Sequence, residues 1–298
     1  MNLAVPMPRI TVITPAYKAA RFIEATLRSV LDQSYPDLEY IVLDGAGDET
    51  AQILEQYDTR LTYWRSRPDE GQYAAITEGL QRASGEIVCW LNADDMLLPG
   101  SLFVVGQIFS QMPAVEWLST LKPAVWDANG FLAHVGSIPG FSKAAFLDGK
   151  YFPPKTRGAQ WIQQESTFFR RALWERAGGV MPPHGLAADF ALWCEFFKLA
   201  ELYGVDYPLA GFRVVAGQRS EAMDLYAKEA QEALCEFREF DGWSRSLRSV
   251  LLSSRVARFP KSKQTLEKSI GYQGKRIFNI NPREAGAGWG VTNYRFSC

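Results

Sequence analysis

Glu86-Ile87-Val88-Cys89-Trp90-Leu91-Asn92-Ala93-Asp94-Asp95 is the stretch that decides the fold. An apolar strand over its first six residues runs straight into two adjacent carboxylates, and Pro99-Gly100 ends the segment. In open α/β sheets, ligands bind just beyond the carboxyl ends of the strands. A divalent cation held by one or two carboxylates plus phosphate oxygens suits such a place. The stretch therefore predicts a metal-diphosphate site, although a surface turn that caps the helix starting near Leu98 would use the same residues.

The N-terminal part alternates strand and helix patterns. Apolar runs predict strands over 10–13, 38–43, 61–64 and 86–91. Helical spacing predicts helices over 19–33, 49–57, 73–83 and 98–111. We expect the first strand to end at Thr14-Pro15, because proline cannot continue a central strand ladder. Strands alternating with helices indicate a parallel sheet with right-handed crossovers, so this part is predicted to be a Rossmann-like α/β unit.

Composition limits the class of protein. The 298 residues suit one large domain or about two, and 47% hydrophobic with 22% charged residues is typical of a soluble globular protein. A net charge of -1 provides no overall attraction to nucleic acid. Four scattered cysteines without a C-x-x-C pair favour reduced thiols and argue against structural zinc. Neither a signal peptide nor an apolar run of membrane-spanning length is recognised, so we expect a cytoplasmic location.

The alternation breaks down after about Val115, where Gly, Pro and aromatic residues become frequent. Helical patterns return at 170–177 and 188–203, and beyond Glu221 the chain becomes helical in composition and then basic. We expect a nucleotide-sugar-binding half over 1–118, an acceptor-binding half of the same domain over 119–220, and a helical, basic extension over 221–298. The basic residues from Arg245 to Arg276 favour a packed helix with a solvated basic face, and a peripheral membrane contact is the alternative.

Polar groups follow three of the predicted strands. They are Pro15-Ala16-Tyr17, Asp44 and Asp94-Asp95. An aromatic ring can stack on a base, a carboxylate can accept hydrogen bonds from base or ribose, and a metal can hold a diphosphate. The three strand ends together predict a nucleotide cleft.

Several motifs in register resemble the family 2 glycosyltransferases of the GT-A fold. They are TPAYK (14–18), TLRSVLDQSYPDLEYIVLDGAGDET (26–50), DEGQYAAITEGLQRASGE (69–86) and WLNADD (90–95), and the resemblance covers residues 9 to about 220. It implies an α/β fold of GT-A type, with a Rossmann-like, mostly parallel central sheet flanked by helices and a helical C-terminal extension. It also implies the transfer of a sugar from a nucleoside diphosphate sugar (UDP, GDP or dTDP) to a carbohydrate or lipid-linked glycan acceptor, without nucleic acid.

The resemblance also implies roles for individual residues. Those implied at the donor are Pro15 and Tyr17 at the base, Asp44 at base or ribose, Asp69 with Gly71 along the nucleotide-sugar, Asp94 at ribose or metal, and Asp95 on Mn²⁺ or Mg²⁺. The tract from Gln163 to Gly179, with Gln164 and Glu165, looks like the acceptor-side motif. Asp189 matches the catalytic base of an inverting displacement. Arg213, Gln218 and Arg219 are phosphate candidates.

Each of these residues also has a structural alternative. Asp44 could be a turn residue, Tyr17 a core residue, Asp189 a helix cap, and Glu165 the partner of Arg170 or Arg171.

Two departures from the family pattern leave other functions open. Val215 stands where relatives often carry a histidine that can approach the metal, and Ala191 stands where many have a second acid. A non-catalytic nucleotide-sugar or glycan-binding partner therefore remains an alternative. A sugar nucleotidyltransferase is a further alternative, but it would need a Gly-rich loop after the first strand, where this chain has Thr14-Pro15-Ala16-Tyr17.

Overall fold

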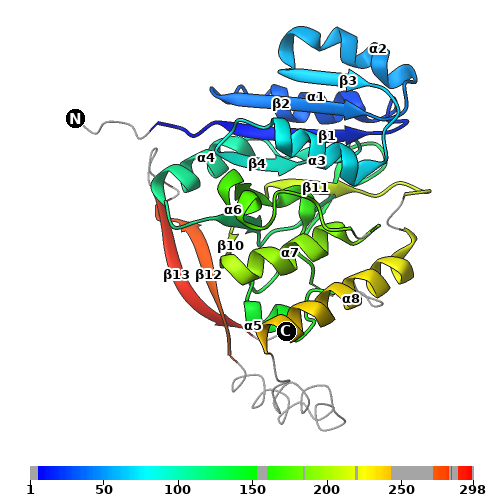
Figure 1. Ribbon diagram of the computed structural model, residues 1–298. Helices are drawn as coiled ribbons and strands as arrows, with labels where there is room; N and C mark the ends of the chain where they lie inside the picture. Colours follow the sequence, from blue (N-terminus) through cyan, green and yellow to red (C-terminus); the bar gives the residue numbers. More distant parts are fainter. Residues whose placement is uncertain are drawn as a thin grey trace.

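The structure is a computed structural model that describes residues 6–152, 160–183, 185–218, 221–242, 271–281, 283 and 288–296. Its N-terminal part alternates strands and helices, as expected (Figure 1). The strands there are β1 (Ile10–Ala16), β2 (Leu38–Asp44), β3 (Tyr63–Ser66), β4 (Ile87–Trp90), β5 (Met96–Leu97) and β6 (Trp117–Thr120). The helices are α1 (Ile23–Leu31), α2 (Glu49–Gln56), the 3-10 helix η1 (Asp58–Arg60), α3 (Gln72–Arg82) and α4 (Ser101–Gln111).

The later elements are shorter and less regular. The strands are β7 (Ala124–Trp126), β8 (Leu132–Val135), β9 (Phe168–Arg170), β10 (Leu202–Val205), β11 (Ala210–Arg213), β12 (Tyr272–Asn279) and β13 (Trp289–Phe296). The helices are α5 (Lys143–Leu147), the 3-10 helix η2 (Gln164–Ser166), α6 (Arg171–Arg176), α7 (Ala188–Leu199) and α8 (Met223–Asp241). Two of them, α6 and α7, confirm the helices expected over 170–177 and 188–203, although α7 ends four residues before the expected end.

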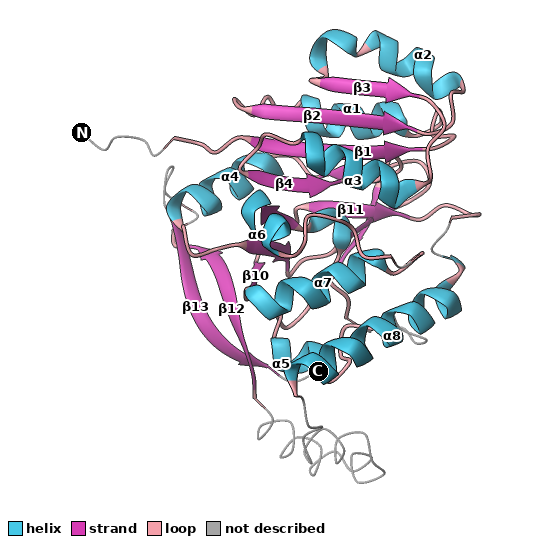
Figure 2. Cartoon of the chain, viewed as in Figure 1, coloured by secondary structure: helices cyan, strands magenta, loops and turns pink. Residues whose placement is uncertain are grey.

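A nine-stranded sheet in the order β13-β12-β10-β6-β9-β4-β1-β2-β3 forms the centre of the molecule, with helices against it (Figure 2). Five of its eight strand pairs are parallel, which confirms the mostly parallel sheet. The boundary drawn at 118/119 falls inside β6, and all three predicted segments contribute strands to this sheet. A second sheet has the order β5-β11-β7-β8.

The central strands β1 and β4 are buried along their whole length because both faces of the sheet are covered. In β4, Val88 and Trp90 belong to the hydrophobic cluster that includes α3 and α7, whereas Ile87 and Cys89 belong to the cluster that includes α1 and α4. Trp90 stacks on Trp193 of α7 with 5.7 Å between ring centroids. Such two-sided burial gives parallel strands a continuous apolar run.

The prediction that β1 ends at Thr14-Pro15 is wrong, because the strand continues to Ala16 and pairs with β2 along its whole length. Pairing with β4 on the other side stops at Ile13. The carbonyl oxygen of Ile13 accepts from the Leu91 N–H, and that of Ala16 accepts from the Gly45 N–H. Because backbone groups alternate between neighbours along a strand, Pro15 faces the β4 side, where no further ladder bond is formed. Its missing N–H therefore does not interrupt the strand.

The helical C-terminal extension is confirmed only for α8. The next described residues form β12 and β13, an antiparallel pair that lengthens the central sheet through β10. The expectation of a helix around Lys275 and Arg276 is therefore wrong. The remaining basic residues, from Arg245 to Lys268, lie outside the described residues. None of the helices within the described ranges combines the length and apolarity that a membrane crossing needs.

Candidate active site

A cleft of about 670 Å³ opens beyond the carboxyl ends of β1 and β4. Its walls come from the turn after β1, the start of α3, the turn after β4, the loop after β11 and the helix α8. The lining residues are Pro15, Ala16, Tyr17, Lys18, Ala19, Phe22, Gly45, Asp69, Gly71, Gln72, Ala75, Asn92, Ala93, Asp94, Leu186, Phe212, Val215, Ala216, Gly217, Gln218 and Tyr226. Five of the sequence-predicted donor residues therefore lie together: Pro15, Tyr17, Asp69, Gly71 and Asp94.

Tyr17 lies at the rim of the cleft and is 67% exposed, so it is not a core residue. The ammonium group of Lys18 lies 5.4 Å from the centroid of the Tyr17 ring. Lys18 has a φ of 50°, in the left-handed region, so the turn leaves the strand sharply. The turn presents an aromatic face and a cation at the entrance of the cleft.

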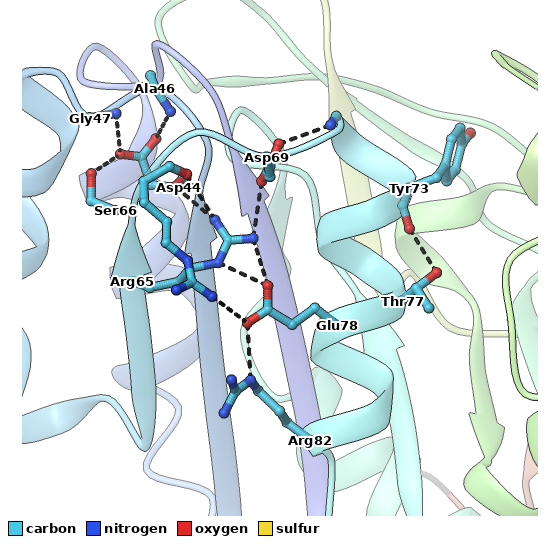
Figure 3. A network of polar contacts seen from close by, with 12 residues as sticks. Asp44, Ala46, Gly47, Arg65, Ser66, Asp69, Tyr73, Thr77, Glu78 and Arg82 are labelled. Atoms are coloured by element: carbon cyan, nitrogen blue, oxygen red, sulfur yellow. Dashed lines mark hydrogen bonds and ion pairs between the residues drawn. The ribbon is translucent and has the colours of Figure 1, made fainter.

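Asp44 is fully buried and is not among the lining residues. Its carboxylate accepts hydrogen bonds from the backbone N–H groups of Ala46 and Gly47 and from the Ser66 hydroxyl (Figure 3). The side chain therefore stabilises the turn that carries Gly45 into the cleft wall. Direct contact between Asp44 and a base or ribose stays a prediction.

Asp69 is held by a buried arginine that sequence reasoning missed. The Arg65 guanidinium donates to Asp69 Oδ2 at 3.1 Å and to Glu78 Oε2 at 2.8 Å (Figure 3). It also donates to the carbonyl oxygens of Asp44 and Arg67. Burial alone would raise the pKa of Glu78, but Arg65 holds it below its ordinary value. Arg65 thus connects β2, β3, α3 and the loop that carries Asp69.

Gly45 and Asp69 are in close contact within the cleft wall. A Cβ at position 45 would lie 2.7 Å from Asp69 Oδ1, so a larger residue there would force the carboxylate or the turn to shift. The same Oδ1 accepts from the Gly71 N–H at 2.9 Å, just before α3. Gly71 has a φ of 108°, which favours glycine at that position as well.

The two acids after β4 have different surroundings. Asp94 lines the cleft, and its Oδ2 accepts from the Gln218 amide at 2.7 Å. Asp95 is fully buried, accepts from the Arg213 backbone N–H at 2.9 Å and accepts from the Asn92 amide at 3.2 Å. Asp94 is therefore the carboxylate that a ligand meets first, and Asp95 lies behind it.

Glu165 and Gln164, from η2, lie beside these acids. Burial, with repulsion from Glu165 and Asp94, raises the pKa of Asp95 well above its ordinary value. Burial also raises the pKa of Glu165 to about 7, and Asp94 and Asp189 add to the rise. Gln164 donates to the Trp90 carbonyl and accepts from Asn92. The acceptor-side pair thus packs against the end of β4, and Glu165 is not paired with Arg170 or Arg171, which bind Glu86 and Glu175.

Arg213 is 3% exposed and braces the acidic turn rather than lining the cleft. Its Nε donates to the Asp94 carbonyl at 2.6 Å, and its guanidinium lies over the ring of Phe22, which does line the cleft. Its Nη2 is buried without a hydrogen-bond partner among the described residues. The neighbouring phosphate candidate Arg219 lies outside those residues.

Asp189 lies in the first turn of α7, one hydrogen bond behind the cleft wall. Its Oδ1 accepts from the Phe190 N–H at 2.8 Å and from the Tyr226 hydroxyl at 3.1 Å. Desolvation raises the pKa of Asp189 to about 6, which these two hydrogen bonds partly oppose. Such a carboxylate is ionised at neutral pH yet basic enough to accept a proton.

The carboxylates at the end of β4 fit a divalent cation that arrives together with a diphosphate. Within the described ranges, no three His, Cys, Asp or Glu side chains converge on one point. Mg²⁺ and similar ions are commonly held by one or two carboxylates plus substrate phosphates, so a complete protein cage is not required. Glu165 Oε1 is buried there without a hydrogen-bond partner among the described residues. Asp94 and Asp95 are the residues that would hold such an ion.

Sequence reasoning missed Tyr226, Leu186, Gln72 and Arg65. Tyr226 and Leu186 come from segments with no strand-end signal, and the apolar pattern of a helix does not tell which aromatic residue faces a ligand. Arg65 sits in a short strand, where only its four acceptors reveal its role. Val215, noted for replacing a histidine, does line the cleft.

The fold is similar to that of GT-A glycosyltransferases of known structure. Staphylococcus aureus TarS 1-349 in complex with UDP-GlcNAc superposes with a TM-score of 0.55 over 88% of this chain and 82% of its own, at 16% identity. The mannosyltransferase PcManGT from Pyrobaculum calidifontis, in complex with GDP-Man and Mn²⁺, superposes with a TM-score of 0.50. The superposition covers 88% of this chain and 84% of PcManGT, at 18% identity. At these identities the likeness shows the fold.

Sequence comparison finds relatives among the glycosyltransferases. Residues 11–122 match the model of glycosyl transferase family 2. An uncharacterized glycosyltransferase of Mycobacterium tuberculosis is 31% identical over 61% of this chain and 66% of its own length. The GalNAc(5)-diNAcBac-PP-undecaprenol beta-1,3-glucosyltransferase of Campylobacter jejuni is 34% identical over 66% of this chain and 62% of its own length. These matches support a family 2 glycosyltransferase. It spans just under two thirds of the length of these relatives.

Proposed function

We propose that this protein transfers a sugar from a nucleoside diphosphate sugar to a hydroxyl of a carbohydrate or lipid-linked glycan, in glycan or polysaccharide biosynthesis. The observation that carries the proposal is the cleft at the strand ends, where Tyr17, Asp69 and Asp94 meet. The UDP-GlcNAc bound to TarS and the GDP-Man bound to PcManGT support a nucleotide-sugar donor. The name of the Campylobacter jejuni relative, an undecaprenol-linked glycan glucosyltransferase, supports a lipid-linked acceptor.

The donor is proposed to lie along the wall formed by the turn after β1 and the start of α3. The exposed Tyr17 ring can stack on the base, and the Asp69 carboxylate can accept hydrogen bonds from base or ribose. Asp94 lies where the diphosphate or ribose would pass. Asp44 contributes through the turn that it stabilises, next to Gly45.

The proposed reaction is a single inverting displacement at the anomeric carbon. Asp189 accepts the proton of the acceptor hydroxyl while the new C–O bond forms and the bond from the sugar to the diphosphate breaks. The nucleoside diphosphate leaves with the electron pair of that bond. When bound at Asp94 and Asp95, Mn²⁺ or Mg²⁺ supplies positive charge that stabilises the leaving group.

Transfer should have an acid limb set by Asp189. A general base must be ionised, and the pKa of Asp189 is raised to about 6. The rate should therefore be full above about pH 7 and fall as the pH drops through 6.

The direct test is calorimetry with UDP, GDP and dTDP sugars, with and without Mn²⁺, followed by assays of donor hydrolysis and transfer. We expect one nucleotide to bind and to be turned over, and Asp189→Asn to bind it without turnover. Binding without turnover by the wild-type protein, unchanged in Asp189→Asn, would instead favour the non-catalytic binding partner, which the loss of a histidine at Val215 suggests.

A cytoplasmic location with peripheral membrane contact through the basic C-terminal segment is part of the proposal. Flotation with anionic and with neutral vesicles tests the contact. Binding to anionic vesicles that weakens with salt is expected, and equal recovery with both kinds of vesicle would contradict it.

A further inference from the structure

Helix α8 reaches the active site from outside the part of the chain that identifies the family. It begins at Met223, whereas the family match ends at residue 122. It packs beside α7, and the two helices run together along one side of the sheet (Figure 1). Two side chains of its first two turns, Tyr226 and Glu229, contact the beginning of α7.

Tyr226 connects the cleft to Asp189. Tyr226 is one of the lining residues of the cleft, and its hydroxyl donates to Asp189 Oδ1 at 3.1 Å. A hydrogen bond donated to a carboxylate favours the ionised form, so Tyr226 lowers the pKa of Asp189 against the effect of burial. The hydroxyl also fixes the direction in which the carboxylate points.

Glu229 fixes the backbone from which α7 starts. Its Oε2 accepts from the N–H groups of Leu186 at 2.6 Å and Ala187 at 2.9 Å. Ala187 is the N-cap residue and has no side chain that could cap the helix. A Cβ on Gly185 would lie 3.1 Å from Glu229 Oε1, so the carboxylate is packed directly against this loop.

The same loop is held from the opposite side by α3. The Tyr73 hydroxyl donates to the Leu186 carbonyl at 2.9 Å. Leu186 is therefore fixed through both its N–H and its C=O, and Asp189 follows three residues later. The titratable groups that face Asp189 and its loop are Tyr226 and Glu229 of α8, Glu165 of η2 and Tyr73 of α3.

We propose that Tyr226 and Glu229 are positioning residues for Asp189, Tyr226 by orienting its carboxylate and Glu229 by anchoring the start of α7. The position of the catalytic base is thereby fixed by α8, a helix outside the part of the chain that matches the family model. This inference rests on the proposed function, in which Asp189 is the base.

The experiment compares Tyr226→Phe and Glu229→Ala with two matched controls. Tyr57→Phe removes a hydroxyl that likewise donates to a carboxylate, Glu24, but on the exposed surface. Glu232→Ala removes an exposed carboxylate from the same helix. Each full-length variant is measured for its pH profile of transfer, for kcat and KM separately, and for calorimetric nucleotide affinity.

For Tyr226→Phe we expect the acid limb to move upward by about 1 pH unit, because the hydroxyl no longer favours the ionised carboxylate. Transfer should fall about fivefold at pH 6 and stay near the wild-type rate at pH 8.5. For Glu229→Ala we expect kcat to fall roughly tenfold or more, because a displaced base loses its alignment. Nucleotide affinity should stay within about twofold in both variants, as in the controls.

A second readout does not depend on activity. The Asp189 carboxyl is titrated by ¹³C NMR in wild type and in Tyr226→Phe, with Asp189→Asn identifying its signal. We expect a higher midpoint in Tyr226→Phe. An unchanged midpoint and an unchanged acid limb would overturn the role of Tyr226, and an unchanged kcat in Glu229→Ala would overturn that of Glu229. If the wild type transfers no sugar from any donor, the proposed function fails. The titration still decides whether Tyr226 lowers the pKa of the Asp189 carboxyl.

Discussion

At the scale of single residues, burial decides what each carboxylate of the site can do. Asp95 and Glu165 lie behind the cleft wall, where burial raises the pKa of both. Asp94 faces the cleft and is the acid that a ligand meets. Asp189 lies between these cases. Burial raises its pKa, but hydrogen bonds from the Phe190 N–H and the Tyr226 hydroxyl limit the rise, so the carboxylate is ionised at neutral pH.

Replacing Asp189 by Asn should abolish transfer and stabilise the fold. Loss of a general base typically lowers the rate by about 10² to 10⁴. The pKa of Asp189 rises from 3.8 to about 6 on folding, so wild-type stability falls as the pH rises through this range. Asn lacks this ionisation. Thermal denaturation should show the variant more stable at pH 7.5, on the order of 1 kcal/mol, and the difference should shrink at pH 4.5. A constant difference between the two pH values would contradict the account.

Replacing Arg65 by Lys should weaken nucleotide binding, although the charge is kept. An ammonium group cannot bond at once to Asp69, Glu78 and the two carbonyl oxygens that the planar guanidinium reaches. We expect about a tenfold rise in Kd by calorimetry and a loss of about 1 to 3 kcal/mol of stability. Arg82→Lys, an exposed partner of Glu78, is the control and should change neither.

At the scale of elements, the turns at strand ends carry the site, and the helices fix those turns. Asp44 closes the turn after β2, and Arg65 ties it to α3 (Figure 3). Glu229 of α8 does the same for the loop before α7. The proposed donor side and the proposed base side of the cleft are thus each braced by one buried or half-buried charged residue.

The turn after β2 provides a test of this bracing. Gly45→Ala places a Cβ 2.7 Å from Asp69 Oδ1, so either the turn or the carboxylate must move. We expect a loss of about 1 to 3 kcal/mol and weaker nucleotide binding. In an Asp69→Ala background the clash is gone, so the same substitution should cost much less in thermal denaturation. An equal loss in both backgrounds would show that the contact with Asp69 is not the cause.

At the scale of the whole molecule, the sequence predicted the N-terminal part well and the C-terminal part poorly. Parallel strands buried on both faces leave continuous apolar runs, so β1 to β4 and their helices could be located. The predicted end of β1 at Thr14-Pro15 was wrong, because only the neighbouring strands determine whether the missing N–H of a proline interrupts a strand. The strand β12 was not predicted, because charged residues such as Lys275 and Arg276 interrupt its apolar pattern. Five of the residues predicted to contact the donor line one cleft. Tyr226 could not be predicted, because its contact with Asp189 depends on how α8 packs on α7.

The carboxylates of Asp94, Asp95 and Glu165, which lie near the end of β4, also lead to a prediction for the molecule as a whole. They repel one another, and no complete metal cage is seen among the described residues. Mn²⁺ alone should therefore hardly change the melting temperature, whereas Mn²⁺ with the bound nucleotide should raise it by several degrees. Asp94→Asn should remove the extra gain from Mn²⁺ and leave the gain from nucleotide alone. A large shift with Mn²⁺ alone would point to a preformed metal centre.

The most direct measurement is a crystal structure of this protein with its nucleotide diphosphate and Mn²⁺. We expect the base against Tyr17 and Asp69, the diphosphate beside Asp94, and the acceptor side of the cleft open towards Asp189 and Tyr226. A nucleotide bound elsewhere on the molecule, or one whose diphosphate points away from Asp94 and Asp95, would contradict it.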